Sequence, residues 1–296
     1  MNDYIGRFAP SPTGLLHIGS LIGALASFLD ARANQGQWLL RMEDLDPPRE
    51  MPGAASAILQ SLEDHGLAWD GEVLWQSQRH DAYRQVIDDL LLANKAFYCT
   101  CSRSDLQASH GIYQGQCRGC VTPPADQDFA LRLQVDDRVV SFDDAIQGRF
   151  SQQLDNDVGD VVLQRKDGLF AYQLAVVVDD AYQAISHVVR GSDLLDSTPR
   201  QIYLQQVMAY TTPGYTHIPV ITNEQGDKLS KQTFAAPLDS HKAAKNIYLA
   251  LMFLNQPLPP EDLSQRVDDI LAWALANWSV DRIPSVAGLP QSTIAL

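Results

Sequence analysis

The chain has 296 residues, of which 45% are hydrophobic, so it can bury a sizeable core as one large domain or two ordinary ones. Its formal net charge of −14 argues against a protein that coats nucleic acid through a general electrostatic field, although a local basic patch stays compatible with it. No stretch approaches the roughly 18 consecutive apolar residues of a membrane span, and the N-terminus lacks a basic region followed by an apolar one. We therefore expect a cytoplasmic globular protein.

The N-terminal segment predicts a parallel strand–helix–strand unit. Residues 3–10 have the apolar and aromatic content of a strand, and residues 16–36 have apolar residues at helical spacing with Gly36 as a stop. Residues 37–46 are typical of a second buried strand that runs into a carboxylate-rich loop. Helical patterns follow at residues 54–66 and 81–96.

The second half of the chain begins with a different pattern. Short alternating runs at residues 129–135, 138–142 and 160–180 are typical of strands joined by tight turns. Helical patterns return at residues 198–210, 242–254 and 267–278, the last two being divided by a proline-rich segment.

A stiff turn follows the first predicted strand, in RFAPSPTGLLHIGS (7–20). In an open parallel sheet, ligands bind outside the carboxyl ends of the strands, and a helix that starts there offers free N–H groups to anions. Gly19 would let a phosphate approach the backbone, and His17 could donate a hydrogen bond to a phosphoryl oxygen. A plain strand-to-helix connection is the alternative, which an isolated Pro-Ser-Pro would favour.

A second segment, GDKLSKQ (226–232), places Lys228 and Lys231 around a serine. Two lysines that close on a polyphosphate would neutralise charge as pyrophosphate leaves. Taken alone, this segment is more typical of a solvated turn.

Together the two segments resemble the paired signatures of class I aminoacyl-tRNA synthetases, here as HIGS and KLSKQ. Four further segments look like the glutamyl branch of that family: GRFAPSPTGLLHIG, RMEDLD, FAYQLAVVVDD and VVRGSDLLDSTPRQ. The resemblance runs from about residue 4 to about residue 235. It implies an α/β fold with a Rossmann-type catalytic domain at 1–240, and L-glutamate and ATP with Mg²⁺ as substrates. Ser20 replaces the second histidine of the signature, but His17 is kept.

After about residue 240, too little chain remains for the anticodon-binding domains of full glutamyl-tRNA synthetases, so we expect a truncated helical stem domain at 241–296. The chain closely resembles a tail-less branch whose members activate glutamate without tRNA and esterify it onto queuosine in the anticodon of tRNA(Asp). Two alternatives are a truncated glutamyl-tRNA synthetase that charges a tRNA 3′ end, and a non-catalytic regulator that binds glutamate or adenylate. Intact Arg7, His17 and Lys231 count against the regulator. Nothing demands more than a monomer.

The resemblance also implies roles for individual residues. Arg7 would pair with the side-chain carboxylate of glutamate, and Glu43 would hold its ammonium group. The alternatives are a structural ion pair for Arg7, a solvated loop acid for Glu43 and a core position for Tyr172. The implied glutamate-binding residues are Arg7, Ala9, Ser11, Glu43, Tyr172 and Arg190. The implied ATP-binding residues are His17, Gly19, Lys228 and Lys231, with His17 and Lys231 as the catalytic ones.

Four cysteines, Cys99, Cys101, Cys117 and Cys120, lie close together, which in a cytosolic chain indicates a metal site rather than a disulfide framework. Four thiolates would satisfy one structural Zn²⁺. The resemblance implies a different set within a small zinc-binding insertion at 97–121: Cys99, Cys101, Tyr113 and Cys117. A thiolate is a better ligand than a phenol, whose unperturbed pKa is about 10, but Cys99-x-Cys101 is tighter than ordinary zinc spacing. Both sets stay open, and we expect the set with Tyr113.

Overall fold

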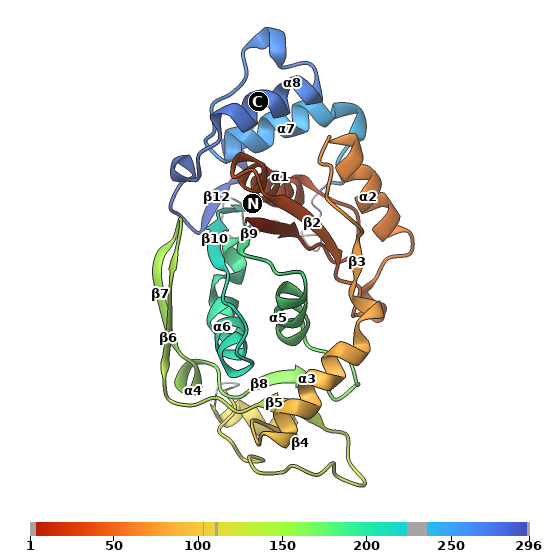
Figure 1. Cartoon of the computed structure of the whole chain (residues 1–296), viewed down its shortest axis with the longest axis vertical. Helices are drawn as coiled ribbons and strands as arrows, with labels where there is room; N and C mark the ends of the chain where they lie inside the picture. Colours follow the sequence, from red (N-terminus) through yellow and green to blue (C-terminus); the bar gives the residue numbers. More distant parts are fainter. Residues whose placement is uncertain (1–3, 103, 110–111, 224–235, 295–296) are drawn as a thin grey trace.

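The computed structural model describes residues 4–102, 104–109, 112–223 and 236–294, and the molecule is elongated (Figure 1). Parallel strands and their helices form the middle of the molecule. The C-terminal helices cover one end, and the cysteine-bearing segment forms the other (Figure 1). Among the described helices, none is both long and apolar enough to cross a membrane.

The first sheet has three parallel strands in the order β1-β2-β3. Residue Arg7 of the first strand lies opposite Leu39 of the second, and the helix between them completes the predicted strand–helix–strand unit. The predicted helix at 54–66 is also confirmed. The elements are β1 (Ile5–Phe8), α1 (Ile18–Ala33), β2 (Gln37–Met42), α2 (Ala54–Asp64) and β3 (Leu74–Trp75).

The end of α1 differs from the prediction in one detail. The left-handed residue after the helix is Gln35, with φ 54°, and not Gly36. A Cβ atom at Gly36 would lie 2.3 Å from the carbonyl oxygen of Tyr4. Glycine is therefore required at this position by the close approach of two backbones, and not by the helix stop.

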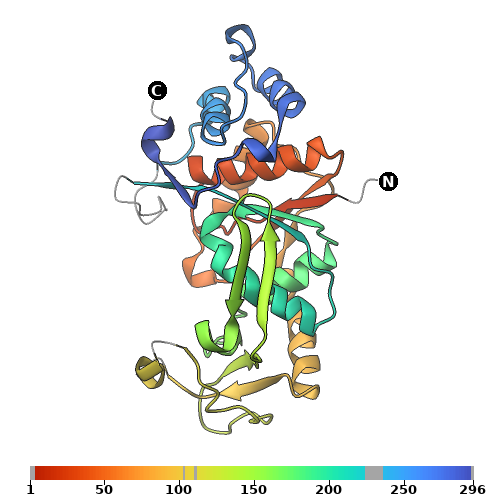
Figure 2. The same cartoon turned by 90° about the vertical axis from the view of Figure 1, so that its left-hand side faces the viewer.

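The second sheet has the strand order β7-β6-β10-β9. Its first two strands form an antiparallel hairpin, which faces the viewer in Figure 2, and β6, β10 and β9 run parallel. The amide of Ser186, just before β9, donates to the carbonyl oxygen of Ile5 at 3.0 Å, so the two sheets lie edge to edge. The strands are β6 (Val139–Asp144), β7 (Gly148–Gln153), β9 (His187–Gly191) and β10 (Gly214–Ile218).

The prediction of strands over residues 160–180 was wrong in its second half. A strand, β8 (Val161–Gln164), is followed by a helix, α5 (Tyr172–Tyr182). All residues from Leu174 to Asp180 are buried, because α5 packs between α3 (His80–Leu92) and α6 (Thr198–Val207). An unbroken apolar run is typical of a buried strand and of a buried helix alike, so periodicity could not separate them.

The cysteine-bearing segment is anchored on a three-stranded antiparallel sheet, β4-β5-β8. The strand β4 ends at Cys99, which delivers this cysteine to the start of the predicted zinc-binding insertion. The remaining elements here are β4 (Ala96–Cys99), β5 (Ala130–Leu133) and α4 (Leu154–Asp157).

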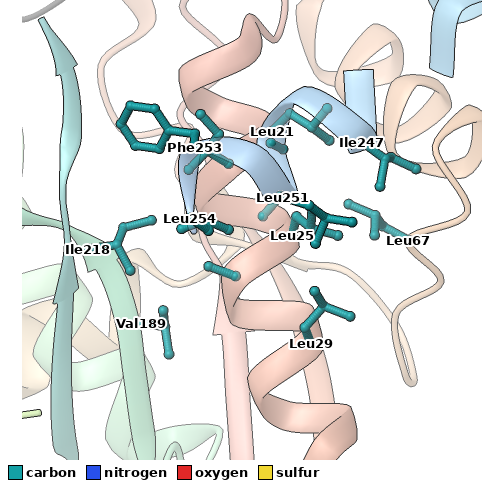
Figure 3. Close-up of a cluster of buried hydrophobic side chains, with 14 of the residues drawn as sticks. Leu21, Leu25, Leu29, Leu67, Val189, Ile218, Ile247, Leu251, Phe253 and Leu254 are labelled. Atoms are coloured by element: carbon teal, nitrogen blue, oxygen red, sulfur yellow. The ribbon is translucent and has the colours of Figure 1, made fainter. Parts of the chain in front are cut away.

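The two predicted C-terminal helices are present as α7 (Ala243–Phe253) and α8 (Val267–Asn277). Leu21 and Leu25 of α1 pack with Leu251 and Leu254, and all four side chains are fully buried (Figure 3). The strands β11 (Val220–Thr222) and β12 (Gly288–Pro290) pair in parallel and connect the C-terminal segment to the chain that follows β10. The C-terminal helices thus share a hydrophobic core with α1, and a domain boundary at residue 240 stays a prediction.

Candidate active site

A pocket of about 270 Å³ lies where the carboxyl ends of β1, β9 and β10 meet the start of α1. This is the position at which open α/β sheets bind their ligands. The eight predicted glutamate- and ATP-binding residues that lie in the described part of the chain all line this single pocket. They are Arg7, Ala9, Ser11, His17, Gly19, Glu43, Tyr172 and Arg190. The two predicted lysines, Lys228 and Lys231, lie outside the described residues.

The turn between β1 and α1 places His17 at the head of the helix. Gly14 has φ 154°, a backbone conformation that favours glycine. The Nδ1 atom of His17 accepts a hydrogen bond from the amide of Ser20 at 3.3 Å, so His17 caps α1. In a neutral imidazole with an accepting Nδ1, the proton sits on Nε2, which is then a donor. A Cβ atom at Gly19 would lie 3.1 Å from this ring, so a larger residue at position 19 would crowd the imidazole.

A network of buried charged side chains holds the pocket residue Arg7 in place. Arg7 Nε donates to Asp180 Oδ1 at 3.2 Å, and Arg41 Nη2 donates to the same oxygen at 2.7 Å. Burial alone would raise the pKa of Asp180, but the two guanidinium groups outweigh it and hold the pKa below its ordinary value. Arg7 therefore makes the structural ion pair that was one alternative, and it lines the pocket as well.

Glu43 follows the end of β2 and is not a solvated loop acid, since its side chain is only 8% exposed. Its amide donates to the carbonyl oxygen of Pro10 at 2.9 Å, which fixes it against the turn. Its Oε1 atom lies 3.7 Å from Arg41 Nη2 and has no hydrogen-bond partner in the described part of the chain. Burial, partly offset by Arg41 and Arg7, raises the pKa of Glu43 to about 7. A buried acceptor without a donor points to a ligand that supplies one.

Arg190 and Tyr172, from the second half of the fold, also line the pocket. Tyr172 is the first residue of α5, and its hydroxyl accepts a hydrogen bond from Arg190 Nη1 at 3.4 Å. Burial raises the pKa of Tyr172, so the hydroxyl stays neutral. Sequence reasoning missed Asp180, which orients Arg7. Its signal was an acidic residue at the end of an apolar run, within FAYQLAVVVDD.

A larger cavity of about 790 Å³ adjoins the first pocket and shares Ser11, Glu43 and Tyr172 with it. Its rim carries both signs of charge and is not acidic throughout. Arg165 Nη1 contacts Asp46 Oδ2 at 3.1 Å. The charged groups that line this cavity besides Glu43 are Arg49, Arg132, Arg165, Lys166, Asp46, Glu50 and Asp167.

Three free cysteines converge at the far end of the molecule. The Sγ atoms of Cys99, Cys101 and Cys117 all lie within 4.8 Å of one another. Tyr113 is buried beside them, and its hydroxyl accepts a hydrogen bond from the amide of Cys117 at 2.6 Å. Cys120 is exposed and is not part of this group. Three convergent thiols are a donor set that suits Zn²⁺, so the residues fit a metal site that lacks one ligand.

The strand ends of a parallel α/β sheet meet the start of a helix at a pocket lined by arginines and a carboxylate. This arrangement is that of a class I tRNA synthetase catalytic domain. Residues 5–256 match the family model described as "tRNA synthetases class I (E and Q), catalytic domain". The chain is 51% identical over 293 residues to a glutamyl-Q tRNA(Asp) synthetase of Pseudomonas putida, covering 99% of this chain and 97% of the relative. The protein of that name from Pseudomonas aeruginosa is 50% identical, with 99% of each chain covered.

Solved structures agree with these relatives. A glutamate tRNA ligase from Elizabethkingia meningosepticum, in complex with its amino acid, superposes with a TM-score of 0.80 at 25% identity. The match covers 99% of this chain and 68% of that one. The chain belongs to the class I tRNA synthetases of the E and Q type, within the family of glutamyl-Q tRNA(Asp) synthetases, and is a ligase.

Proposed function

We propose that this protein activates L-glutamate with ATP, without needing tRNA, and transfers it to queuosine in the anticodon of tRNA(Asp). The observation that carries the proposal is the single pocket in which Arg7, Arg190 and Glu43 lie beside the start of α1. The names of the relatives support the choice of acceptor. We place the protein in the cytoplasm, as a monomer.

The charges around the pocket suit glutamate. Three buried arginines, Arg7, Arg41 and Arg190, face two buried carboxylates, Asp180 and Glu43, when Glu43 is ionised. Glutamate carries two carboxylates and one ammonium group, which match the guanidinium groups of Arg7 and Arg190 and the carboxylate of Glu43. The forked guanidinium of Arg7 suits the planar side-chain carboxylate and disfavours the neutral amide of glutamine. Glu43 then accepts hydrogen bonds from the substrate ammonium.

Activation requires the α-carboxylate of glutamate to attack the α-phosphorus of ATP, with loss of pyrophosphate. The enzyme supplies positioning and charge stabilisation and forms no covalent bond to the substrate. His17 Nε2 would donate to a phosphate oxygen, and the first amides of α1 would bind the same anion. Lys228 and Lys231 would neutralise the leaving pyrophosphate, and Mg²⁺ bound to ATP would supply further positive charge.

Transfer requires a hydroxyl group of the acceptor to reach the carbonyl carbon of the glutamyl adenylate. We assign the acceptor to the larger cavity, because it opens onto the first pocket along Ser11, Glu43 and Tyr172. The hydroxyl oxygen forms the ester bond and gives up its proton, the bond from carbonyl carbon to phosphate oxygen breaks, and AMP leaves. Arg49, Arg165 and Lys166 on the rim would contact RNA phosphates next to the modified base.

We propose one structural Zn²⁺ per chain, held by Cys99, Cys101, Cys117 and Tyr113. The zinc-binding residues lie away from the glutamate pocket, and four protein ligands would leave no open position for catalysis. The ion would hold together the connection between β4 and β5 that forms one wall of the larger cavity, to which Cys101 belongs.

One pair of assays tests the proposed function. The first is glutamate-dependent ATP–pyrophosphate exchange without tRNA, and the second is transfer of labelled glutamate to tRNA(Asp) with and without queuosine. We expect exchange in the absence of tRNA, and labelling only when queuosine is present. Labelling of the tRNA 3′ end would instead show a truncated glutamyl-tRNA synthetase. Binding of glutamate without any exchange would show a non-catalytic regulator.

A further inference from the structure

A row of three polar side chains crosses the second sheet beside the glutamate pocket. Asp144 of β6, His217 of β10 and Arg190 of β9 come from three neighbouring parallel strands. His217 and Arg190 are direct register partners, so their side chains leave the same face of the sheet. The side chains of Asp144 and His217 are fully buried, and Arg190 is 7% exposed. Apart from Arg190, this row has no place in the mechanism above.

Asp144 determines which nitrogen of His217 carries a proton. Its Oδ2 atom lies 2.6 Å from His217 Nδ1, and the backbone amide of His217 donates to the same carboxylate at 3.0 Å. The amides of Ile146 and Gln147 also donate to Asp144, at 3.0 and 2.9 Å. Burial alone would raise the pKa of Asp144, but these hydrogen bonds outweigh it and keep the pKa below its ordinary value. An ionised carboxylate accepts only, so Nδ1 of His217 must be the donor.

The other nitrogen of His217 faces the guanidinium of Arg190. Arg190 Nε donates to His217 Nε2 at 3.0 Å, which requires a lone pair on that nitrogen. Burial lowers the pKa of His217 and Arg190 lowers it further, so the ring is neutral with its proton on Nδ1. Arg190 Nη2 donates to Thr198 Oγ1 at 2.8 Å. The guanidinium is thus held on two sides and presents Nη1 toward Tyr172 and the pocket.

We infer that His217, oriented by Asp144, is a positioning residue that fixes the guanidinium of Arg190 for glutamate recognition. The inference rests on the proposed binding of glutamate in this pocket. His217 is absent from the residues that line the pocket, so it acts through Arg190 and does not touch the substrate. A guanidinium that is already held in place loses less conformational freedom on binding, which strengthens the binding of a carboxylate.

Two substitutions at one position separate the contacts of His217. In His217→Gln, the side-chain amide can reach the place of Nε2 and offer its oxygen to Arg190. In His217→Asn, the shorter amide can replace Nδ1 as the donor to Asp144, but it leaves Arg190 Nε without an acceptor. A matched pair tests the carboxylate: Asp144→Asn alters the partner of Nδ1, and Asp143→Asn changes an exposed neighbour on the same strand, whose side chain is 77% exposed.

The measurement is exchange without tRNA, with separate KM values for glutamate and ATP, together with urea unfolding of each variant. We expect His217→Asn and Asp144→Asn to raise KM for glutamate about tenfold, as for one lost hydrogen bond to a charged group, with KM for ATP unchanged. His217→Gln should stay within about threefold of the parent, because it keeps the acceptor. Asp143→Asn should equal the parent.

Three results would overturn the inference: an unchanged KM for glutamate in His217→Asn, equal changes in the two KM values, or losses that follow only the unfolding midpoints. The inference and the proposed function fail separately. If the parent shows no exchange, glutamate binding is measured by titration calorimetry. Weaker binding in His217→Asn than in His217→Gln would then support the inference while the proposed function fails, and no binding to the parent would overturn both.

Discussion

Arg7 Nε donates a hydrogen bond to Asp180 Oδ1 at 3.2 Å, although the two residues are 173 positions apart in the chain. Arg7 is the third residue of β1, and Asp180 lies on α5 in the second half of the catalytic fold. Arg41 Nη2 shares the same carboxylate oxygen at 2.7 Å. One buried acid therefore fixes two arginines under the pocket, and it joins the two halves of the fold at the place where glutamate is proposed to bind.

We expect Asp180→Asn to lower the free energy of unfolding by about 3–5 kcal/mol, because two buried guanidinium groups lose their shared charge partner. The pKa of Asp180 is held below its ordinary value. Its contribution to stability is therefore present above the unfolded-state pKa of about 3.9 and is lost as the pH falls through the folded-state value. Urea unfolding across this acidic range measures both effects. Asp81→Asn is the control, because the Arg84–Asp81 pair is exposed and should leave the unfolding midpoint unchanged.

Glu43 should give glutamate binding a pH dependence near neutrality. Burial raises its pKa to about 7, so the carboxylate that would hold the substrate ammonium forms as the pH rises through that value. We expect KM for glutamate to fall between about pH 6 and pH 8, and Glu43→Gln to remove this dependence. The effect on stability has the opposite direction. Because the folded-state pKa exceeds the unfolded-state value, stability is lost as the pH rises from about 4.3 to about 7. An unaltered pH profile in Glu43→Gln would contradict the assignment.

The proposed zinc site predicts that Cys101→Ser lowers the zinc content per chain. Cys120→Ser is the matched control, because this cysteine is exposed and lies outside the group of three. Elemental analysis of the purified proteins decides between the two ligand sets. Zinc loss in Tyr113→Phe but not in Cys120→Ser supports the set with Tyr113, and the reverse result supports four thiolates. Unchanged zinc in Cys101→Ser would exclude both sets.

The basic side chains on the rim of the larger cavity predict that the transfer step can be impaired without loss of the activation step. We expect Arg165→Glu to lower transfer to queuosine-bearing tRNA(Asp) about tenfold and to leave exchange without tRNA unchanged, because charge reversal opposes RNA phosphates. Arg149→Glu is the control, since Arg149 lies on the β6–β7 hairpin, is 68% exposed and does not line the cavity. Equal transfer rates in the two variants would place the RNA elsewhere.

The shared core of α1 and α7 predicts that the C-terminal helices stabilise the catalytic half. Leu251 is fully buried against α1, as Figure 3 shows. Leu251→Ala should therefore lower the free energy of unfolding by about 2–5 kcal/mol. Leu92→Ala removes a leucine that is 83% exposed and should have little effect. Urea unfolding measures both free energies.

Most of the elements could be predicted from local signals. Apolar spacing identified α1, α2, α3, α6, α7 and α8, and the turn chemistry before His17 located the start of α1. The helix α5 could not be assigned, because burial on all sides removes the periodic pattern that distinguishes a helix. Gly36 was predicted as the helix stop, but glycine is required there by the close approach of the Tyr4 backbone, which no local pattern shows.

The residue types of the site were determined by the sequence alone: an arginine before a stiff turn, a histidine at a helix start, a carboxylate after the second strand and clustered cysteines. The two segments HIGS and KLSKQ, together with four further segments, sufficed to indicate the family. The tertiary structure decided what holds these residues in place. Asp180 binds Arg7, and Asp144 and His217 fix Arg190. These residues are far from their partners in the chain, and they come together only when the strands take their register. Hydrogen bonds between such distant residues leave no local periodicity, so only the folded protein shows them.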